Sequence, residues 1–552
     1  MAQPYYADGL KLKNPDPQFP KTSIYERILP RFERSFFKKE SNMMTGKNGI
    51  RFKEVVKQDT CPECNGARLN PGILLCRIDG KNIADCCNMQ IDELLDFIKT
   101  IHEDTVEPLL GAIKESLYNL LSIGLGYLAL SRETSSLSGG ESQRVKLVRH
   151  LGSSLTDLTY IFDEPSIGLH PNDVQKLNNL LLELRNKGNT VLIIEHDPDV
   201  IAIADHIVDM GTGAGKNGGN IIYEGNIKNL LKAGTPTGEY LKRKNQLKTL
   251  YRKETGYLQL SNVTFHNLKN VSVQIPKNVL TVITGVAGSG KSSLIKSLLK
   301  KDKNIVMIDQ SGLRGSKRSN IATYTGILDV IRVLFAKQNK VRQSFFSRNS
   351  DGACPECKGL GVISTDLAFL DAVEVCCEHC NGSGFKPEIL QYTLHGKNIT
   401  DIMHMSISEA LTFFKQPEIA ETLQRLCNVG LDYITIGQSL NTFSGGERQR
   451  LKLANELGKK GNIYVFDEPT TGLHGSDISR LMKLFNNLVD DNNTVIIIEH
   501  NMDIISQADW IIDMGLGAGK YGGNIIFEGT PQNILKDKTS LTGKHLNLYL
   551  EK

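Results

Sequence analysis

The sequence has no apolar run long enough to cross a bilayer, and its first ten residues, MAQPYYADGL, lack the hydrophobic core of a signal peptide. Its formal net charge is only +4, so any argument for nucleic-acid binding must come from a local basic cluster. The remaining composition is ordinary for a globular protein, with 40% hydrophobic and 23% charged residues over 552 positions. We expect roughly three or four domain-sized units and no membrane partner.

Disulfide bonds are not expected either. Seven of the eleven cysteines lie in or beside C-x-x-C pairs, which is typical of metal binding in a reducing compartment and predicts a cytoplasmic protein. CPEC and CEHC are separated by nineteen residues, and glycines follow each pair. Two such turns present four thiolates tetrahedrally, which predicts a zinc module over 354–380. Its Zn²⁺ ligands would be Cys354, Cys357, Cys377 and Cys380.

The chain contains one sequence pattern twice. CNGARLNPGILLCRIDGKNIAD at Cys64 aligns with CNGSGFKPEILQYTLHGKNITD at Cys380, 316 residues later. Further along the chain the offset is 304, so that Glu164 aligns with Glu468. Near the ends of the two copies, TGEYL at Thr237 resembles TGKHL at Thr542. An offset that persists in this way indicates two tandem copies of one structural unit.

One motif occurs in a single copy. GVAGSGKSS begins at Gly285, and its equivalent in the first copy would lie before residue 1. We therefore expect the chain to begin inside the first copy. Residues 1–60 would be the tail of an inserted region and 61–231 the remainder of the first copy. Residues 232–256 form a polar, basic linker, and 257–552 form the complete second copy.

The motif GVAGSGKSS has the features of a phosphate-binding loop. A buried strand, LTVIT, precedes it, and an amphipathic helix, KSSLIKSLLKK, follows it. Its glycines let backbone N–H groups surround phosphate at the N-terminus of a helix. Lys291 would hold the β- and γ-phosphates and Ser292 would bind Mg²⁺. The predicted nucleotide-binding residues here are Gly285, Gly288, Ser289, Gly290, Lys291, Ser292 and Ser293.

Acidic residues that suit phosphoryl transfer follow a second buried strand. In YVFDEP, Asp467 would hold the metal and Glu468 would act as general base toward the attacking water. His500 follows the strand TVIIIE, from which it would reach the γ-phosphate. Gln310, after another short strand, would sense the metal and the water. The order of these motifs along the chain predicts ATP hydrolysis with Mg²⁺.

That ordered set resembles the ATP-binding cassette (ABC) family. The resemblance implies that LSGGE binds the γ-phosphate of the facing cassette, so Ser138, Gly139 and Gly140 of the first copy would close over nucleotide held by Lys291. The fold class expected is α/β, with tandem P-loop cassettes, helical signature insertions and a zinc-binding module. The equivalent site that faces FSGGE at Phe443 would be half built, because it needs a phosphate loop from the first copy.

Motifs outside the ATP site resemble one branch of that family, the UvrA proteins of bacterial nucleotide excision repair and their paralogues. They include RSNIATYTG ending at Gly326, VGLDYITIGQS at Val429, the zinc module, and the pair DEPSIGLH and DEPTTGLH. The resemblance covers most of residues 25–545 and implies a homodimeric, DNA-binding ATPase that is not itself a nuclease. It also implies UvrB as a partner.

The sequence departs from the family pattern in its first half. The family's UvrB-binding domain and its first C-x-x-C pair have no counterpart in the 552 residues, which argues against UvrB as a partner. Cys61 and Cys64 are consequently half of a zinc site. Cys86 and Cys87 align with Ile402 and Met403, so they do not supply the other half.

A basic cluster predicts the DNA contact. Arg314, Lys317 and Arg318 lie within five positions of one another, and side chains of this kind bind phosphates without reading sequence. A solvated basic loop is the alternative interpretation of this cluster.

Three interpretations of the whole chain remain open from sequence. It is a UvrA-type repair ATPase, a UvrA-like paralogue that protects against DNA-binding antibiotics, or a truncated, non-catalytic remnant. Use as the energising subunit of a membrane transporter is a more distant fourth, since the zinc module has no role there.

Overall fold

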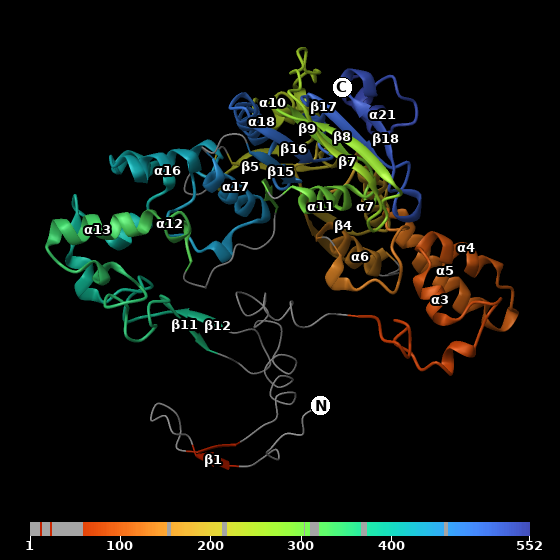
Figure 1. The fold of residues 1–552 in the computed structure, drawn as a ribbon, viewed down its shortest axis with the longest axis horizontal. Helices are drawn as coiled ribbons and strands as arrows, with labels where there is room; N and C mark the ends of the chain where they lie inside the picture. Colours follow the sequence, from red (N-terminus) through yellow and green to blue (C-terminus); the bar gives the residue numbers. More distant parts are fainter. Residues whose placement is uncertain are drawn as a thin grey trace. The chain divides into compact units, whose positions relative to one another are not determined.

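The computed structural model describes residues 11–13, 22–24, 59–137, 139–151, 156–211, 213, 218–302, 304–309, 319–365, 373–457 and 462–551 (Figure 1). They divide into two compact units, Met1–Cys86 and Cys87–Lys552. The first unit contains the antiparallel strands β1 (Lys11–Lys13) and β2 (Thr22–Ile24) and a turn with Cys61 and Cys64. Helix α3 (Ile83–Asn88) spans the boundary. No helix of the described residues is both long and apolar enough to cross a membrane.

The second copy is built on a six-stranded sheet with strand order β10-β15-β16-β9-β17-β18. All neighbouring strands are parallel except β17 and β18. Strands β9 and β16 are buried along their whole length, which explains why their sequences are continuously apolar. The strands are β9 (Leu280–Thr284), β10 (Ile305–Ile308), β15 (Ile463–Asp467), β16 (Thr494–Ile498), β17 (Trp510–Met514) and β18 (Ile525–Gly529).

Side chains that alternate along these strands enter two different cores. On one face, Val465 and Ile496 pack with α11 (Lys291–Lys301) and with the hairpin β7 (Tyr257–Val263) and β8 (Val271–Pro276). On the other face, Phe466 and Ile497 pack with residues of α18 (Gly475–Asp490). Short helices α19 (Met502–Ile505), α20 (Pro531–Ile534) and the longer α21 (Leu541–Glu551) complete this copy.

A helical region that contains the zinc module is inserted between β10 and β15. It begins after β10 and ends with the signature helix α17 (Gly445–Glu456), whose first turn is capped by Ser444 and Glu447. The predicted fold class, an α/β cassette with a helical signature insertion, is therefore confirmed. The other elements are α12 (Ile321–Tyr324), α13 (Ile327–Asn339), β11 (Val362–Thr365), β12 (Val373–Cys376), β13 (Thr393–Leu394), β14 (Lys397–Asn398), α14 (Ile399–Met403), α15 (Ile407–Phe413) and α16 (Pro417–Asn428).

The first copy repeats the later part of this plan. Strands β3 (Thr159–Asp163) and β4 (Thr190–Ile194) are parallel, and β5 (Ile207–Met210) and β6 (Ile221–Gly225) are antiparallel. Among the described residues, no strand pairs with both β4 and β5 in the way that β9 pairs with β16 and β17. The helices are α4 (Ile91–Thr100), α5 (Glu107–Ser122), α6 (Gly139–Leu151), α7 (Pro171–Asn186), α8 (Pro198–Ile201) and α9 (Ile227–Leu230).

One face of the first copy's strands is consequently exposed. Six apolar side chains are between 49% and 65% exposed, whereas five of their equivalents in the second copy are 1% exposed or less. The pairs follow the 304-residue offset, for example Ile161 with Val465 and Leu192 with Ile496. The six are Ile161, Leu192, Ile194, Val208, Met210 and Ile221. Because burial of such side chains stabilises a sheet by about 25 cal/mol per Å², the two copies differ in local stability.

The segment 232–256, predicted to link the copies, contains structure of its own. The segment includes helix α10 (Pro236–Lys242). Two basic side chains that follow this helix in the segment bind Asp509 of the second copy. The Nζ of Lys248 lies 2.5 Å from Asp509 Oδ1, and Arg252 Nη1 lies 3.0 Å from Oδ2. Burial would raise the pKa of Asp509, but the hydrogen bonds from Lys248 and the backbone N–H groups outweigh it and lower that pKa. The linker is therefore attached to the second copy.

The difference in burial predicts a difference in hydrogen exchange. Peptides covering β4 and β5 should exchange their amides roughly ten-fold faster than peptides covering β16 and β17, because fewer neighbours protect them. Exchange measured by mass spectrometry on the whole chain compares the two pairs in one sample. Equal protection would contradict the expected difference in local stability.

Candidate functional site

The phosphate loop lies between β9 and α11 in the second copy. Gly285, Gly288 and Gly290 have φ of 128°, 75° and 109°, values that residues with a side chain rarely adopt. At Gly285 a Cβ would also lie 2.1 Å from the carbonyl oxygen of Met514. The Nζ of Lys291 donates to the carbonyl oxygens of Gly285 (2.8 Å) and Val286 (3.0 Å), so the lysine folds back over the loop. The loop thus has the conformation that a phosphate-binding turn requires.

Lys291 carries a buried charge that carboxylates surround. Burial lowers the pKa of Lys291 to about 8, and four carboxylates oppose this lowering. Three of them, Glu468, Asp467 and Asp513, belong to the second copy, but the fourth, Asp173, lies on α7 of the first copy. The electrostatic environment of the lysine therefore includes both copies.

Glu468 directly follows β15, where a general base was predicted. Its φ is 48°, a left-handed backbone that is uncommon for a residue with a side chain, and its equivalent Glu164 has φ of 46°. Burial raises the pKa of Glu468 to about 7, with further contributions from the charges of Asp467 and Glu499. Arg144 on the signature helix α6 of the first copy opposes this rise. A carboxyl group with a raised pKa is suited to accept a proton near neutral pH.

Glu499 organises the loops around this carboxylate, a role that its position in IIEHN did not reveal. Its Oε1 accepts from Thr470 N (3.0 Å), and its Oε2 accepts from the backbone N–H groups of His500 (2.8 Å) and Asn501 (3.0 Å). Glu195 makes the equivalent hydrogen bonds in the first copy, to Ser166, His196 and Asp197. His500 itself is buried, and burial lowers its pKa well below the usual range.

The first copy's signature region lies against the second copy's phosphate loop. The ring of Tyr127 is 2.9 Å from where a Cβ on Gly288 would be, and its hydroxyl donates to Glu141 of the signature at 2.5 Å. An ion pair of 2.7 Å between Lys520 and Glu93 joins the copies nearby. Gly139 and Gly140 begin α6, the helix that carries Glu141. Tyr127 is therefore a contact between the copies that sequence reasoning missed.

A second pair of contacts joins Glu468 and Glu164 each to a glycine of the opposite copy. A Cβ on Gly168 of the first copy would lie 2.8 Å from Glu468 Oε2. In the reciprocal contact, a Cβ on Gly472 of the second copy would lie 3.3 Å from Glu164 Oε2. A cavity of about 220 Å³ between the copies is lined by both glutamates and by His196 and His500. The two halves of the site are therefore in mutual contact.

Several predicted site residues lie outside the described residues, namely Ser138, Gln310, Arg314, Lys317 and Arg318. Two serines of the phosphate loop differ in exposure: Ser289 is fully buried, whereas Ser292, at the start of α11, is exposed. An exposed Ser292 and the carboxylate of Asp467 suit a Mg²⁺ ion that also binds phosphate. Burial raises the pKa of Asp467, and the charge of Lys291 opposes this rise.

The equivalent half site in the first copy contains the later motifs only. Glu164 Oε1 lies 3.7 Å from His196 Nε2, and burial together with the charge of Glu195 raises the pKa of Glu164. In the described part of the chain, no loop like Gly285–Ser293 faces the second copy's signature helix. That one composite site is complete stays a prediction from the sequence.

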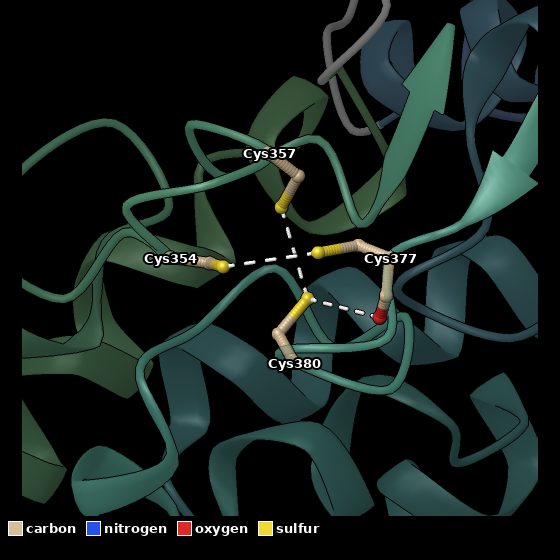
Figure 2. A group of neighbouring side chains, drawn as sticks. All are labelled: Cys354, Cys357, Cys377 and Cys380. Carbon is tan, nitrogen blue, oxygen red and sulfur yellow. Dashed lines mark hydrogen bonds between the residues drawn. The ribbon is translucent and has the colours of Figure 1, made fainter.

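The four cysteines of the zinc module converge in space (Figure 2). All four sulfurs lie within 4.8 Å of one another, with Cys354 to Cys377 at 4.0 Å and Cys357 to Cys380 at 3.7 Å. Tetrahedral Zn²⁺ with bonds of ~2.3 Å requires sulfurs at about this separation. Backbone N–H groups of Gly361 and Gly384 donate to Cys357 and Cys380, which stabilises thiolates. The residues therefore fit a zinc ion.

No second group of this kind occurs among the residues that the structure describes. Cys61 is exposed and Cys64 is partly exposed in the first unit. Cys376, next to the ligand Cys377, is exposed and lies outside the cluster.

Comparison with known proteins agrees with this geometry. Residues 268–471 match the family model described as ABC transporter. The UvrABC system protein A of Aquifex aeolicus is 42% identical over 574 residues, covering 96% of this chain and 61% of that protein. The same protein of Staphylococcus aureus (strain MRSA252) is 41% identical over 575 residues, covering 96% and 60%. The crystal structure of UvrA2 from Deinococcus radiodurans matches with a TM-score of 0.88 and 35% identity, covering 96% of this chain and 70% of that one.

The fold and the site together define a twin-cassette member of the ABC ATPase class. One cassette contributes a phosphate loop and the other a signature region in contact with it. The chain belongs to the UvrA family, as the identity and coverage of these matches show. It spans about 60% of the length of the curated relatives it matches.

The cysteine cluster predicts one zinc ion per chain. Substituting Cys357→Ser should abolish zinc binding and lower the melting temperature, because three ligands cannot complete the tetrahedral site. Inductively coupled plasma mass spectrometry measures the zinc content, and thermal unfolding measures the melting temperature. Cys376→Ser is the matched control, since this thiol is adjacent but exposed, and it should leave both values unchanged. Full zinc content in Cys357→Ser would contradict the assignment.

Proposed function

We propose that the chain hydrolyses ATP at one composite site, with Lys291 and Glu468 from the second copy and the signature region from the first. The contact of Tyr127 with the phosphate loop at Gly288 is the observation that carries this proposal. It is supported by the convergence of Lys291, Asp467, Glu468 and His500 at the ends of adjacent strands.

The residues have distinct roles in this proposal. Backbone N–H groups of the glycine loop and the Lys291 ammonium bind the phosphates, while Gly139 and Gly140 close the site from the first copy. Mg²⁺ held by Ser292 and Asp467 would neutralise phosphate charge when bound. Glu468 accepts a proton from the attacking water, for which its raised pKa is suited. His500 orients the γ-phosphate, and Gln310 the water.

We further propose that this ATPase acts on DNA as part of nucleotide excision repair in the cytoplasm, as a homodimer. Membership of the UvrA family supports this, together with the zinc module inserted beside the signature region. Arg314, Lys317 and Arg318 would contact phosphates. A UvrB-type partner is proposed only for a form that contains the binding domain that the 552 residues lack.

Substitutions at the two half sites test the ATPase proposal. Lys291→Ala should remove essentially all turnover, and Glu468→Gln should lower it by roughly 10²–10⁴-fold while the protein retains bound ATP, since only the base is lost. Phosphate release and retention of radiolabelled ATP provide the measurements.

Glu164→Gln is the matched control for Glu468→Gln. It changes the equivalent glutamate in the half that has no phosphate loop among the described residues, so turnover should remain within about two-fold of the parent chain. Substantial turnover in Lys291→Ala, or a loss in Glu164→Gln equal to that in Glu468→Gln, would contradict the single-site proposal.

DNA binding should depend on salt. Fluorescence anisotropy with a duplex at 50 to 200 mM salt should show weaker binding as salt rises, and each of Arg314→Ala, Lys317→Ala and Arg318→Ala should reduce the slope of log affinity against log salt by about one. Lys536→Ala, an exposed lysine on another part of the chain, should leave the slope unchanged. Binding that does not weaken with salt would argue against phosphate contacts.

A further inference from the structure

The repeated TGEYL and TGKHL segments have a structural role that the ATPase mechanism above does not use. In each case the threonine of the segment forms a hydrogen bond with the last histidine of DEPSIGLH or DEPTTGLH. His170 Nε2 lies 3.3 Å from Thr542 Oγ1, and His474 Nε2 lies 3.1 Å from Thr237 Oγ1. Helix α21 therefore packs on α7, and α10 on α18.

Thr542 donates to an aspartate at the end of a strand in the second copy, and Thr237, in the segment 232–256, donates to one in the first copy. Thr542 Oγ1 lies 3.0 Å from Asp513 Oδ1 on β17, and Thr237 Oγ1 lies 2.8 Å from Asp209 Oδ1 on β5. A histidine, a threonine and an aspartate thus form the same chain of hydrogen bonds twice, each time across the junction between the copies.

The direction of the hydrogen bonds from His170 follows from its neighbours. The backbone N–H of Asn172 donates to His170 Nδ1 at 3.3 Å, so the ring proton is on Nε2, which then donates to Thr542. Asp513 accepts from Thr542 and also from Ser540 Oγ at 2.6 Å. His170 is 0% exposed, and Thr542 and Asp513 are 1% exposed. Because these groups are buried, loss of one partner removes a hydrogen bond that bulk water does not readily replace.

In the second copy this chain ends beside the phosphate loop. Asp513 is in register with Thr284, the residue before Gly285, and the carbonyl of Met514 next to it lies against Gly285. A cavity of about 10 Å³, enough for one water molecule, is lined by His170, Gly285, Asp513 and Thr542 among others. The other end of this chain of hydrogen bonds is His170, two residues after Gly168, which contacts Glu468. The ring centroid of His170 lies 5.8 Å from that of His500.

We propose that His170, Thr542 and Asp513 form a positioning relay, through which the first copy holds the phosphate loop of the second in its productive conformation. The inference rests on the proposed ATP hydrolysis at Lys291. His170 is a positioning residue because it acts on the loop through Thr542 and Asp513. In the first copy the equivalent chain ends at Asp209 on β5, which pairs only with β6 among the described residues. That second chain joins the copies without a phosphate loop to hold.

The two equivalent threonines provide a matched test. Thr542→Val in the full chain should lower kcat for ATP by roughly 10-fold or more with little change in KM, because a small displacement of the loop impairs reaction more than binding. Thr542→Ser keeps the hydroxyl and should restore kcat to within about two-fold of the parent. Thr237→Val removes the equivalent hydroxyl and should leave kcat within about two-fold, while thermal unfolding reports any structural cost of either change.

A double substitution tests whether the residues act together. His170→Leu should lower kcat as Thr542→Val does, and combining the two should be no worse than the more severe single change. If Thr542→Val does not fold, His170→Leu still removes the hydrogen bond between His170 and Thr542 from the histidine side. A parental kcat in Thr542→Val or His170→Leu, an equal loss in Thr237→Val, or losses that multiply would overturn the relay. Each of these outcomes is measured against a parent chain that hydrolyses ATP, so it overturns the relay alone. A parent chain that does not hydrolyse ATP overturns the proposed function and the relay with it.

Discussion

The compensation of one buried cation organises the junction between the two copies. Lys291 is almost fully buried, and an ammonium group in that position requires nearby negative charge. Its own copy supplies Asp467, Glu468 and Asp513, and the first copy supplies Asp173. Arg144 of the first copy opposes the raised pKa of Glu468. Both copies therefore contribute charge to the site. The contacts across the junction are reciprocal as well: glycine to glutamate, and histidine to threonine, in both directions.

The same reciprocity shows where the two copies differ. Glu195 and Glu499 make equivalent hydrogen bonds, and Glu164 and Glu468 share an uncommon backbone conformation. The strands that carry these residues are nevertheless packed differently, because β16 and β17 enclose β9 whereas β4 and β5 have no such neighbour among the described residues. Junction contacts depend on loops at the ends of strands, so they persist in the first copy although one face of its strands is exposed.

Much of the fold and of the site could be predicted from sequence. The cysteine spacing predicts the cluster in Figure 2, since two short turns bring their sulfurs together locally. The glycine loop likewise predicts its own backbone, because positive φ depends on residue type. Tyr127, Glu499 and Asp513 were not predicted, since a tyrosine or a buried acid has no local pattern that distinguishes it from an ordinary core residue. The packing of the 232–256 segment on Asp509 was not predicted either, because polar composition alone resembles that of a free linker.

The sequence by itself determined that two copies of an ABC-type cassette are present, that one phosphate loop serves them within these 552 residues, and that four cysteines suit zinc. These conclusions depend on local chemistry and on order along the chain. Only the tertiary structure decided which residues of one copy contact the other. His170 and Thr542, for example, are 372 positions apart, and their hydrogen bond exists because α7 and α21 pack together. The phosphate loop, first distinguished by its single occurrence, is thus held in place by residues of both copies.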